Sequence, residues 1–269
     1  MNGSERWKPW FGPVALIGGL VIAVVGGAVV VLVAQGGAPA HATNLSPGET
    51  DVATLIQDLA FVGVSVALAR TVGRVSPAQF GLRPPRDRRR AVALVVGGLV
   101  AFFVLSAVWL AVLHVNGEEK QLVKDIGGYG GTLDVLAACA VTTVLAPICE
   151  ETLFRGLMFR SLTNWRGPWP AALITGVLFG AVHGLSAPPA DLLPLAFLGV
   201  LLCGIYQWTG SLYPCIALHV LNNSISLGAD EHWAWRAVEL VAGALVAVAF
   251  VLWLVRLASV RWLATPATD

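Results

Sequence analysis

Long apolar segments separated by short polar ones recur along the whole chain of 269 residues. The first of them runs from Phe11 to Ala34. A helix needs about 20 mostly apolar residues to cross a bilayer core of ~30 Å, and the segments have about this length. Their runs of Val, Leu, Ala and Gly lack the alternation that transmembrane barrel strands require. The pattern therefore predicts an all-α membrane helix bundle with about eight transmembrane helices.

The fourth of these helices is expected to begin near Thr132 and to pass through Pro147 into the polar residues that follow it. We expect the first segment to be a retained helix, because it is too long and too glycine-rich at its end for a cleaved signal. No separate soluble domain or internal repeat is visible, so residues 1–269 are predicted to form one membrane domain. The other six helices are expected near residues 51–70, 91–115, 169–186, 191–208, 211–227 and 235–258.

The composition agrees with a protein whose solvent is the bilayer. Hydrophobic residues make up 57% of the chain and charged residues only 12%, which is too apolar for a soluble fold. The bilayer is therefore an expected partner, and nucleic acid is not. All four cysteines lie in apolar stretches without a C-x-x-C pair, so we expect small buried thiols rather than a disulfide or a zinc knuckle; these are Cys139, Cys149, Cys203 and Cys215.

The distribution of Lys and Arg predicts the orientation, because cytoplasmic loops carry an excess of them. If the N-terminus is cytoplasmic and eight helices cross, 14 of the 17 basic residues fall at inside ends, Arg155 among them. Only Lys120, Lys124 and Arg236 fall outside. We therefore expect a multi-pass protein of the plasma membrane with both termini cytoplasmic. The arginine-rich stretch 81–90 is expected to anchor this topology, with binding of anionic lipid as the alternative.

The densest group of ionisable residues inside an apolar span is Glu150, Glu151 and Arg155. An ionisable side chain at the membrane centre costs at least ~2.5 kcal/mol, so it needs a partner or a purpose. Residues four apart share a helix face, which predicts that Glu151 pairs with Arg155. Glu150 is rotated by about 100° and is expected to point elsewhere as a free carboxylate. The alternative is that both acids merely cap a helix at the water interface.

Two histidines lie in later apolar spans, His183 after Phe179 and His219 before a pair of asparagines. Asn223 is one helical turn from His219, and Asn222 is the rival partner at a spacing of three. Each group alone could be a hydrogen bond between helices. A count of helix rise along the spans allows all of them to reach one polar cavity in the middle of the membrane.

These groups have the chemistry that amide hydrolysis requires. A carboxylate can remove a proton from water, and imidazole and carboxamide N–H groups can stabilise the oxyanion that forms on the attacked carbonyl. Water is the expected nucleophile, and Cys149 beside Glu150 is an alternative one.

The signatures E-E-x-x-x-R, F-x-x-x-H and H-x-x-x-N occur here in this order and on successive helices. In this combination the chain resembles the CPBP family, also called the Abi or CAAX protease and bacteriocin-processing family. The resemblance implies an intramembrane endopeptidase related to the type II enzymes that cleave prenylated C-a-a-X proteins, with the catalytic helices at residues 132–227. Its expected substrate is a membrane-anchored or lipidated peptide or protein. The signature residues are Glu150, Glu151, Arg155, Phe179, His183, His219 and Asn223.

The resemblance also implies a role for each site residue. Glu150 would activate the water with help from His183, and His219 and Asn223 would form the oxyanion hole. Glu151 and Arg155 would complete and orient the first signature. We expect no cofactor. The alternative is zinc held by Glu150, His183 and His219, because a set of two histidines and one glutamate binds zinc elsewhere.

Two other functions fit the same residues. One is a non-catalytic membrane scaffold or a bacteriocin-immunity protein, which would tolerate loss of Glu150. The other is a small proton-coupled transporter that uses the buried acids and histidines. It would show ion-coupled flux and no cleavage.

Overall fold

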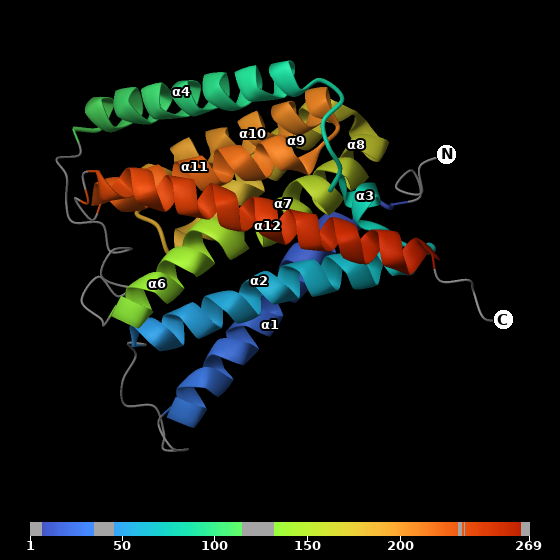
Figure 1. Cartoon of the computed structure of the whole chain (residues 1–269), viewed down its shortest axis with the longest axis horizontal. Helices are drawn as coiled ribbons and strands as arrows, with labels where there is room; N and C mark the ends of the chain where they lie inside the picture. Colours follow the sequence, from blue (N-terminus) through green and yellow to red (C-terminus); the bar gives the residue numbers. More distant parts are fainter. Residues whose placement is uncertain (1–6, 35–45, 115–131, 231–232, 234, 265–269) are drawn as a thin grey trace.

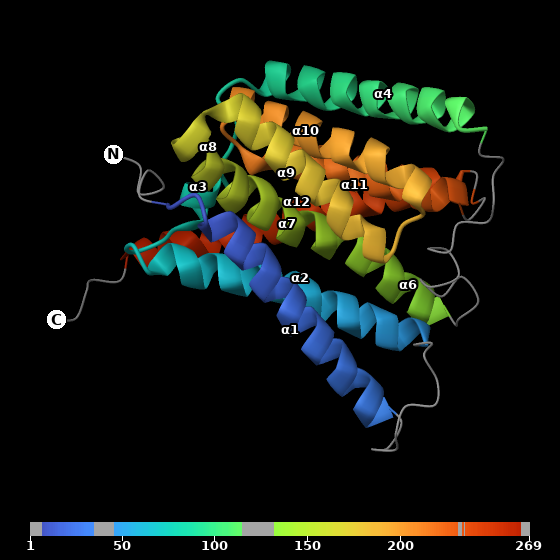
Figure 2. The ribbon, with the colours of Figure 1, turned by 180° about the vertical axis from the view of Figure 1, so that it is seen from behind.

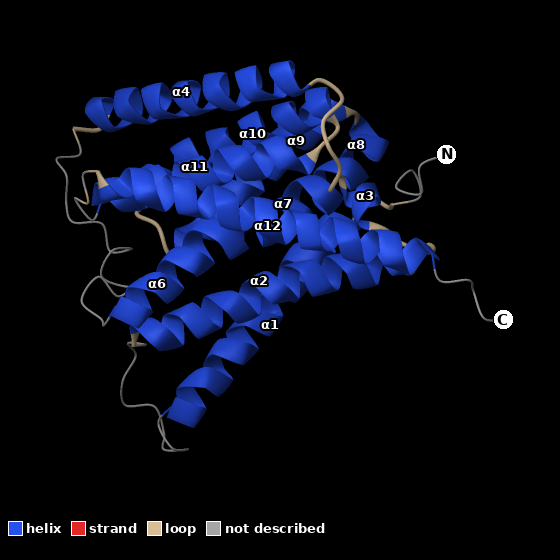
Figure 3. Cartoon of the chain, in the orientation of Figure 1, coloured by secondary structure: helices blue, strands red, loops and turns tan. Residues whose placement is uncertain are grey.

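The computed structural model describes residues 7–34, 46–114, 132–230, 233 and 235–264, and the described residues form helices, turns and loops but no strand (Figure 3). The α-helices are α1 (Phe11–Ala34), α2 (Pro47–Arg70), α3 (Pro77–Phe80), α4 (Arg88–Val112), α6 (Thr132–Ala140), α7 (Ala146–Glu151), α8 (Arg160–Arg166), α9 (Pro168–Val182), α10 (Leu192–Thr209), α11 (Leu212–Asp230) and α12 (Arg236–Ala264). Short helices of other types are η2 (Val141–Leu145), η3 (Thr152–Phe159), η4 (His183–Leu185) and η5 (Pro189–Asp191).

All eight predicted segments are helical, which confirms the predicted all-α fold, although several ends differ. Helix α2 begins at Pro47, four residues earlier than expected, because Ser46 caps its first turn and Glu49 bonds back to the Ser46 backbone. The third helix starts at Arg88 instead of Ala91, since the Asp87 carboxylate accepts a hydrogen bond from the Arg90 N–H. The expected end of that helix at residue 115 and the loop that follows it lie outside the described residues.

The helices run back and forth between two ends of the bundle (Figures 1 and 2). The segment from α6 to α8 passes through the middle, between a layer of α9, α10 and α11 and the helix α2. Helix α1 packs on α2, helix α4 covers α10 and α11, and α12 lies against α11. The polar residues of the central segment are therefore enclosed by helices from both halves of the chain.

The bundle has an apolar exterior and a partly polar interior, as a structure surrounded by lipid should. Val24 on α1, Val96 on α4 and Val246 on α12 expose more than half of their surface. The interior contains fully buried charged side chains, among them Glu151 and Arg155. Six helical segments of the described chain are long and apolar enough to cross a bilayer, whereas α9 is a shorter apolar helix of 15 residues. The protein is thus a multi-pass membrane helix bundle.

Helices α9 and α10 approach each other closely at three glycines. A Cβ atom on Gly199 would lie 2.7 Å from the Gly176 Cα atom, and one on Gly180 would lie 2.6 Å from the Leu192 carbonyl oxygen. Any larger residue would push the two backbones apart, as is common where membrane helices pack through small residues. This close approach brings the Gly199 carbonyl within reach of the central segment.

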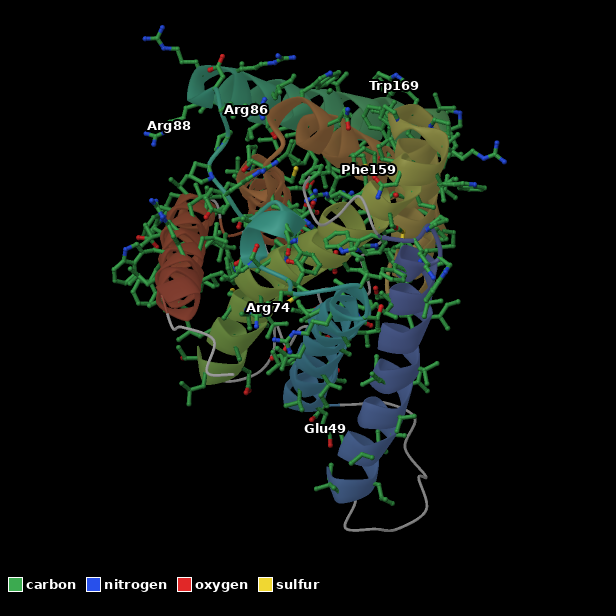
Figure 4. All side chains as sticks on the ribbon, turned by 90° about the vertical axis from the view of Figure 1, so that its right-hand side faces the viewer. Glu49, Arg74, Arg86, Arg88, Phe159 and Trp169 are labelled. Atoms are coloured by element: carbon green, nitrogen blue, oxygen red, sulfur yellow. The ribbon has the colours of Figure 1, made fainter. Side chains whose placement is uncertain are left out.

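Arginine residues gather at the end of the bundle where the described chain begins and ends. The Arg83 Nε donates to the Gly210 carbonyl (2.9 Å), and Arg160 donates to the Gln79 carbonyl and lies over the Trp7 ring. Figure 4 views the molecule from this end, where Arg86 and Arg88 project away from the helices.

The helix α3 was not predicted, because its four residues carry no periodic signal. It packs against η3 through Phe80, which a Cβ on Gly156 would approach to 3.2 Å.

The predicted position of Arg155 at an inside end of the bundle is wrong. Its side chain is fully buried in the bundle and paired with Glu151. Without Arg155 the predicted excess of basic residues at the inside ends remains. Of the other basic residues in that count, Arg6, Lys120 and Lys124 lie outside the described residues.

We expect the arginine-bearing end of the bundle to face the cytoplasm. A single cysteine at Arg86, in a variant without the four native cysteines, should not react with a membrane-impermeant maleimide added to intact cells, whereas a cysteine at Asp191 at the opposite end should. The same Arg86 variant should react after the membrane is permeabilised. Strong labelling of the Arg86 site in intact cells would reverse the orientation.

Candidate active site

The central segment changes its helical winding just before the two glutamates. In η2 the Ala146 N–H bonds to the Val141 carbonyl, five residues back, which is the π-helical pattern. In this register the next carbonyl, that of Thr142, would bond to residue 147, which is a proline without an N–H. The Asn223 Nδ2 of α11 donates to the Thr142 carbonyl instead (3.0 Å). Pro147 therefore frees a carbonyl that binds a residue of the predicted site.

Glu151 and Arg155 form the predicted ion pair, with 2.7 Å between Arg155 Nη1 and Glu151 Oε1. Neither side chain has any exposed surface. The Arg155 Nη2 donates to the Gly199 carbonyl of α10 (2.9 Å), and the guanidinium lies 4.5 Å from the centre of the Phe179 ring of α9. Hydrogen bonds and a cation–π contact thus compensate the buried charge.

His219 lies between the two glutamates. Its Nδ1 is 3.0 Å from Glu151 Oε1, and its Nε2 is 3.9 Å from Glu150 Oε2. Because the Glu151 oxygen can only accept when it is ionised, Nδ1 carries a hydrogen and donates it. Glu150 is not part of the Glu151–Arg155 pair, but the imidazole presents one nitrogen to each carboxylate and so brings both into the same site.

His183 lies at the end of α9, half-buried, on the other side of Phe179. Its Nδ1 is 2.7 Å from the Phe179 carbonyl oxygen, and a carbonyl only accepts, so Nδ1 is the donor and Nε2 can accept a proton. The Phe179 ring is 4.8 Å from the His183 ring and 5.6 Å from the His219 ring. Phe179 therefore contacts both histidines and also Arg155.

The two asparagines of α11 have different surroundings. Asn222 is buried and donates to the Asn223 Oδ1 (3.2 Å). Asn223 is only partly buried and uses one amide hydrogen on the Thr142 carbonyl. An amide group has two N–H bonds, so Asn223 retains a second donor. Spacing along the helix left the choice between the two residues open, and these contacts favour Asn223 as the donor toward a ligand.

Of the two glutamates, Glu150 makes fewer contacts with other polar groups than Glu151. The Glu150 side chain is 13% exposed, yet its Oε2 is buried without a hydrogen-bond partner among the described residues.

The neighbouring Cys149 is buried, as are Cys203 and Cys215, while Cys139 is partly exposed. In the described chain no three His, Cys, Asp or Glu side chains are arranged to hold a metal ion.

Asp58 of α2 is an acidic residue of this region that the sequence analysis missed. Its side chain is fully buried and its charge interacts with that of Glu150. Asp58 is also an ionisable residue in an apolar span, and such a residue needs a partner or a purpose. It went unnoticed because it lies outside the three signatures.

The bundle encloses an acid, a buried ion pair and two histidines. The protein is therefore of the class of polytopic membrane proteins with a polar site between their helices. Residues 132–225 match the family model described as type II CAAX prenyl endopeptidase Rce1-like, and this segment contains all six predicted site residues. This match over residues 132–225 confirms the predicted resemblance to the CPBP family.

Two curated relatives match parts of the chain. An uncharacterized 24.3 kDa protein of Escherichia coli is 35% identical over 97 residues, which are 35% of this chain and 44% of that protein. The UPF0177 protein YxdF of Lactococcus lactis is 30% identical over 115 residues, which are 40% of this chain and 60% of that protein. The chain therefore spans about half the length of these relatives. No solved structure matches the chain.

Replacing Arg155 by Met should destabilise the protein strongly, because it leaves the Glu151 carboxylate buried without its cation. Breaking one partner of a buried pair costs about 3–5 kcal/mol, whereas replacing both with apolar residues of similar size is often neutral. The double variant Glu151→Leu, Arg155→Met should therefore be more stable than Arg155→Met alone. Thermal unfolding in detergent, followed by size-exclusion chromatography, measures both. Equal stability of the two variants would contradict the pair's assigned role.

Proposed function

We propose that this protein is an intramembrane endopeptidase that hydrolyses a peptide bond with a water molecule activated by Glu150. The observation that carries the proposal is the arrangement of the two glutamates around His219. Glu151 is neutralised by Arg155 and holds His219 Nδ1. Glu150 Oε2 lies 3.9 Å from His219 Nε2 and accepts no hydrogen bond from the described residues. One carboxylate orients the ring, and the other is available as a base.

The proposed reaction starts with Glu150 accepting a proton from water. The water oxygen bonds to the carbonyl carbon of the substrate, and the carbonyl oxygen becomes an oxyanion. His183 can assist, since its Nε2 is an acceptor when Nδ1 donates to the Phe179 carbonyl. Glu150 then gives its proton to the amine nitrogen as the C–N bond breaks, so the products are a carboxylic acid and an amine.

The oxyanion is assigned to Asn223 and His219. Asn223 has one amide hydrogen left after its bond to the Thr142 carbonyl. His219 can donate from Nε2 when this nitrogen also carries a proton, and the ring is already held in place by Glu151. Preorganised donors of this kind contribute roughly 2.7–4 kcal/mol each to transition-state stabilisation.

The proposed substrate is a membrane-anchored or lipidated peptide or protein. The site lies among helices whose outer surface is apolar, so a substrate held in the bilayer is already concentrated near it. The matching family model carries the description of a CAAX prenyl endopeptidase, and this description supports a lipidated substrate. The proposed mechanism uses no metal ion.

Replacing Glu150 by Gln should lower cleavage by about 10²- to 10⁴-fold, because the amide keeps the shape but is not a base. A panel of prenylated and other membrane-anchored reporter peptides, presented to the purified protein in liposomes, provides the assay. Glu239→Gln is the matched control, since Glu239 is an exposed acid on α12, and it should retain wild-type cleavage. Wild-type cleavage by the Glu150→Gln protein would refute the proposal.

Replacing Asn223 by Ala should lower cleavage by about 10²- to 10³-fold through loss of an oxyanion donor. Asn222→Ala should cost much less, because Asn222 reaches the site only through Asn223. Treatment with a chelator should leave wild-type cleavage unchanged. Loss of activity on chelation and recovery on zinc addition would favour the zinc alternative, and ion-coupled flux without cleavage would favour a transporter.

A further inference from the structure

Asp58 is a buried acid in the half of the chain that the family model does not cover. It lies in the middle of α2, has no exposed surface, and neither of its carboxyl oxygens has a hydrogen-bond partner among the described residues. Buried polar groups are almost always paired with protein or ordered water. A carboxyl group left so completely without protein partners inside an apolar span calls for a function.

The helix register places Asp58 beside Glu150. Helix α2 packs against α7 and η3, and both run from left to right in Figure 1. The Phe61 and Phe154 rings meet edge to face across this contact, with 6.5 Å between their centroids. Asp58 lies three residues before Phe61, and Glu150 lies four residues before Phe154. Residues three or four positions apart share a helix face. Asp58 on α2 and Glu150 on α7 therefore each lie one turn before the Phe61–Phe154 contact.

The orientation of the Glu150 carboxylate supports this placement. Its Oε2 is buried without a partner, so the 13% of the side chain that is exposed belongs to its other atoms. The charges of Asp58 and Glu150 interact, and both act on the buried Cys149, the residue next to Glu150. Oε2 thus lies in the interior, with His219 Nε2 3.9 Å away on α11, and the α2 helix that carries Asp58 packs against the same segment.

We propose that Asp58 is a positioning residue of the active site, which holds the Glu150 carboxylate through its Oε2, directly or across one water molecule. The hydrogen comes from the bridging water or from a proton carried by Asp58. Glu150 is then held with its other oxygen toward the substrate. This inference rests on the proposed function, in which Glu150 is the base, and it assigns to α2 a part in a site otherwise built from residues 132–225.

The other ionisable groups near α2 do not fill this role. Helix α1 has no ionisable side chain. On α6, Asp134 interacts with Asp51, which lies two turns before Asp58. On the central segment, Glu151 is occupied by Arg155 and His219. Among these groups, Glu150 and the thiol of Cys149 are the ones whose charges interact with that of Asp58.

The first test compares cleavage by purified variants, per folded protein. Asp58→Leu should lower kcat by about 10- to 100-fold with little change in KM, because a displaced base costs rate and not substrate binding. Asp58→Asn should retain most of the activity, since its amide can still donate to Glu150 Oε2. Asp51→Leu is the matched control, an acid seven residues earlier on the same helix, and should leave kcat unchanged.

Wild-type kcat in folded Asp58→Leu would overturn the proposal, and so would an equal loss in the Asp51→Leu control. If Asp58→Leu is not recovered folded, Asp58→Ser takes its place with the same expected loss, because its hydroxyl is too short to reach Glu150.

A second measurement does not depend on cleavage. The infrared carboxyl or carboxylate band of Glu150 is identified as the band that Glu150→Gln removes. Its frequency reports hydrogen bonding to that carboxyl group, so it should shift in Asp58→Leu, stay near its wild-type value in Asp58→Asn and not change in Asp51→Leu. A band unaffected by Asp58→Leu would overturn the proposal. The band could also shift in Asp58→Leu while the Glu150→Gln protein still cleaves. That pair of results would support the contact between Asp58 and Glu150 but refute Glu150 as the base.

Discussion

The buried ion pair between Glu151 and Arg155 is the interaction on which the rest of the site depends. From this pair, contacts extend to three further helices, to Gly199 of α10, to Phe179 of α9 and to His219 of α11. In a low-dielectric interior an unpaired charge is costly, so each charge holds the other in place. The same pair sets the orientation of His219 and, through it, the position of the ring against Glu150.

A second constraint is the irregular backbone around Pro147. The proline and the π-helical turn before it take the Thr142 carbonyl out of the helix ladder, and Asn223 binds that carbonyl. Irregular helical backbone within the membrane is tolerated where protein groups satisfy the freed carbonyls. Here the group that binds the freed carbonyl is Asn223, which is itself a proposed catalytic donor. The irregular backbone before Pro147 therefore fixes a side chain of α11.

The two halves of the chain contribute differently to this arrangement. The family segment, residues 132–225, supplies every residue of the three signatures. The preceding helices α1 and α4 expose apolar side chains and close the bundle toward lipid. Helix α2 differs from both, because it carries a fully buried acid, Asp58, whose charge interacts with that of Glu150. The site is therefore enclosed, and in our proposal also completed, by residues that carry no family signature.

The sequence by itself determined the helices and the pairing of Glu151 with Arg155. Lipid forces each apolar span to satisfy its own backbone bonds, and a spacing of four residues places two side chains on one helix face. Only the tertiary structure decided that both glutamates approach His219, that Asn223 binds Thr142 and that Arg155 is interior. It also decided that Asp58 is buried in the same bundle as Glu150, where their charges interact. These contacts join different helices, and their rotation and approach depend on packing at sites such as Gly176 and Gly199, which the periodicity of a single segment does not specify.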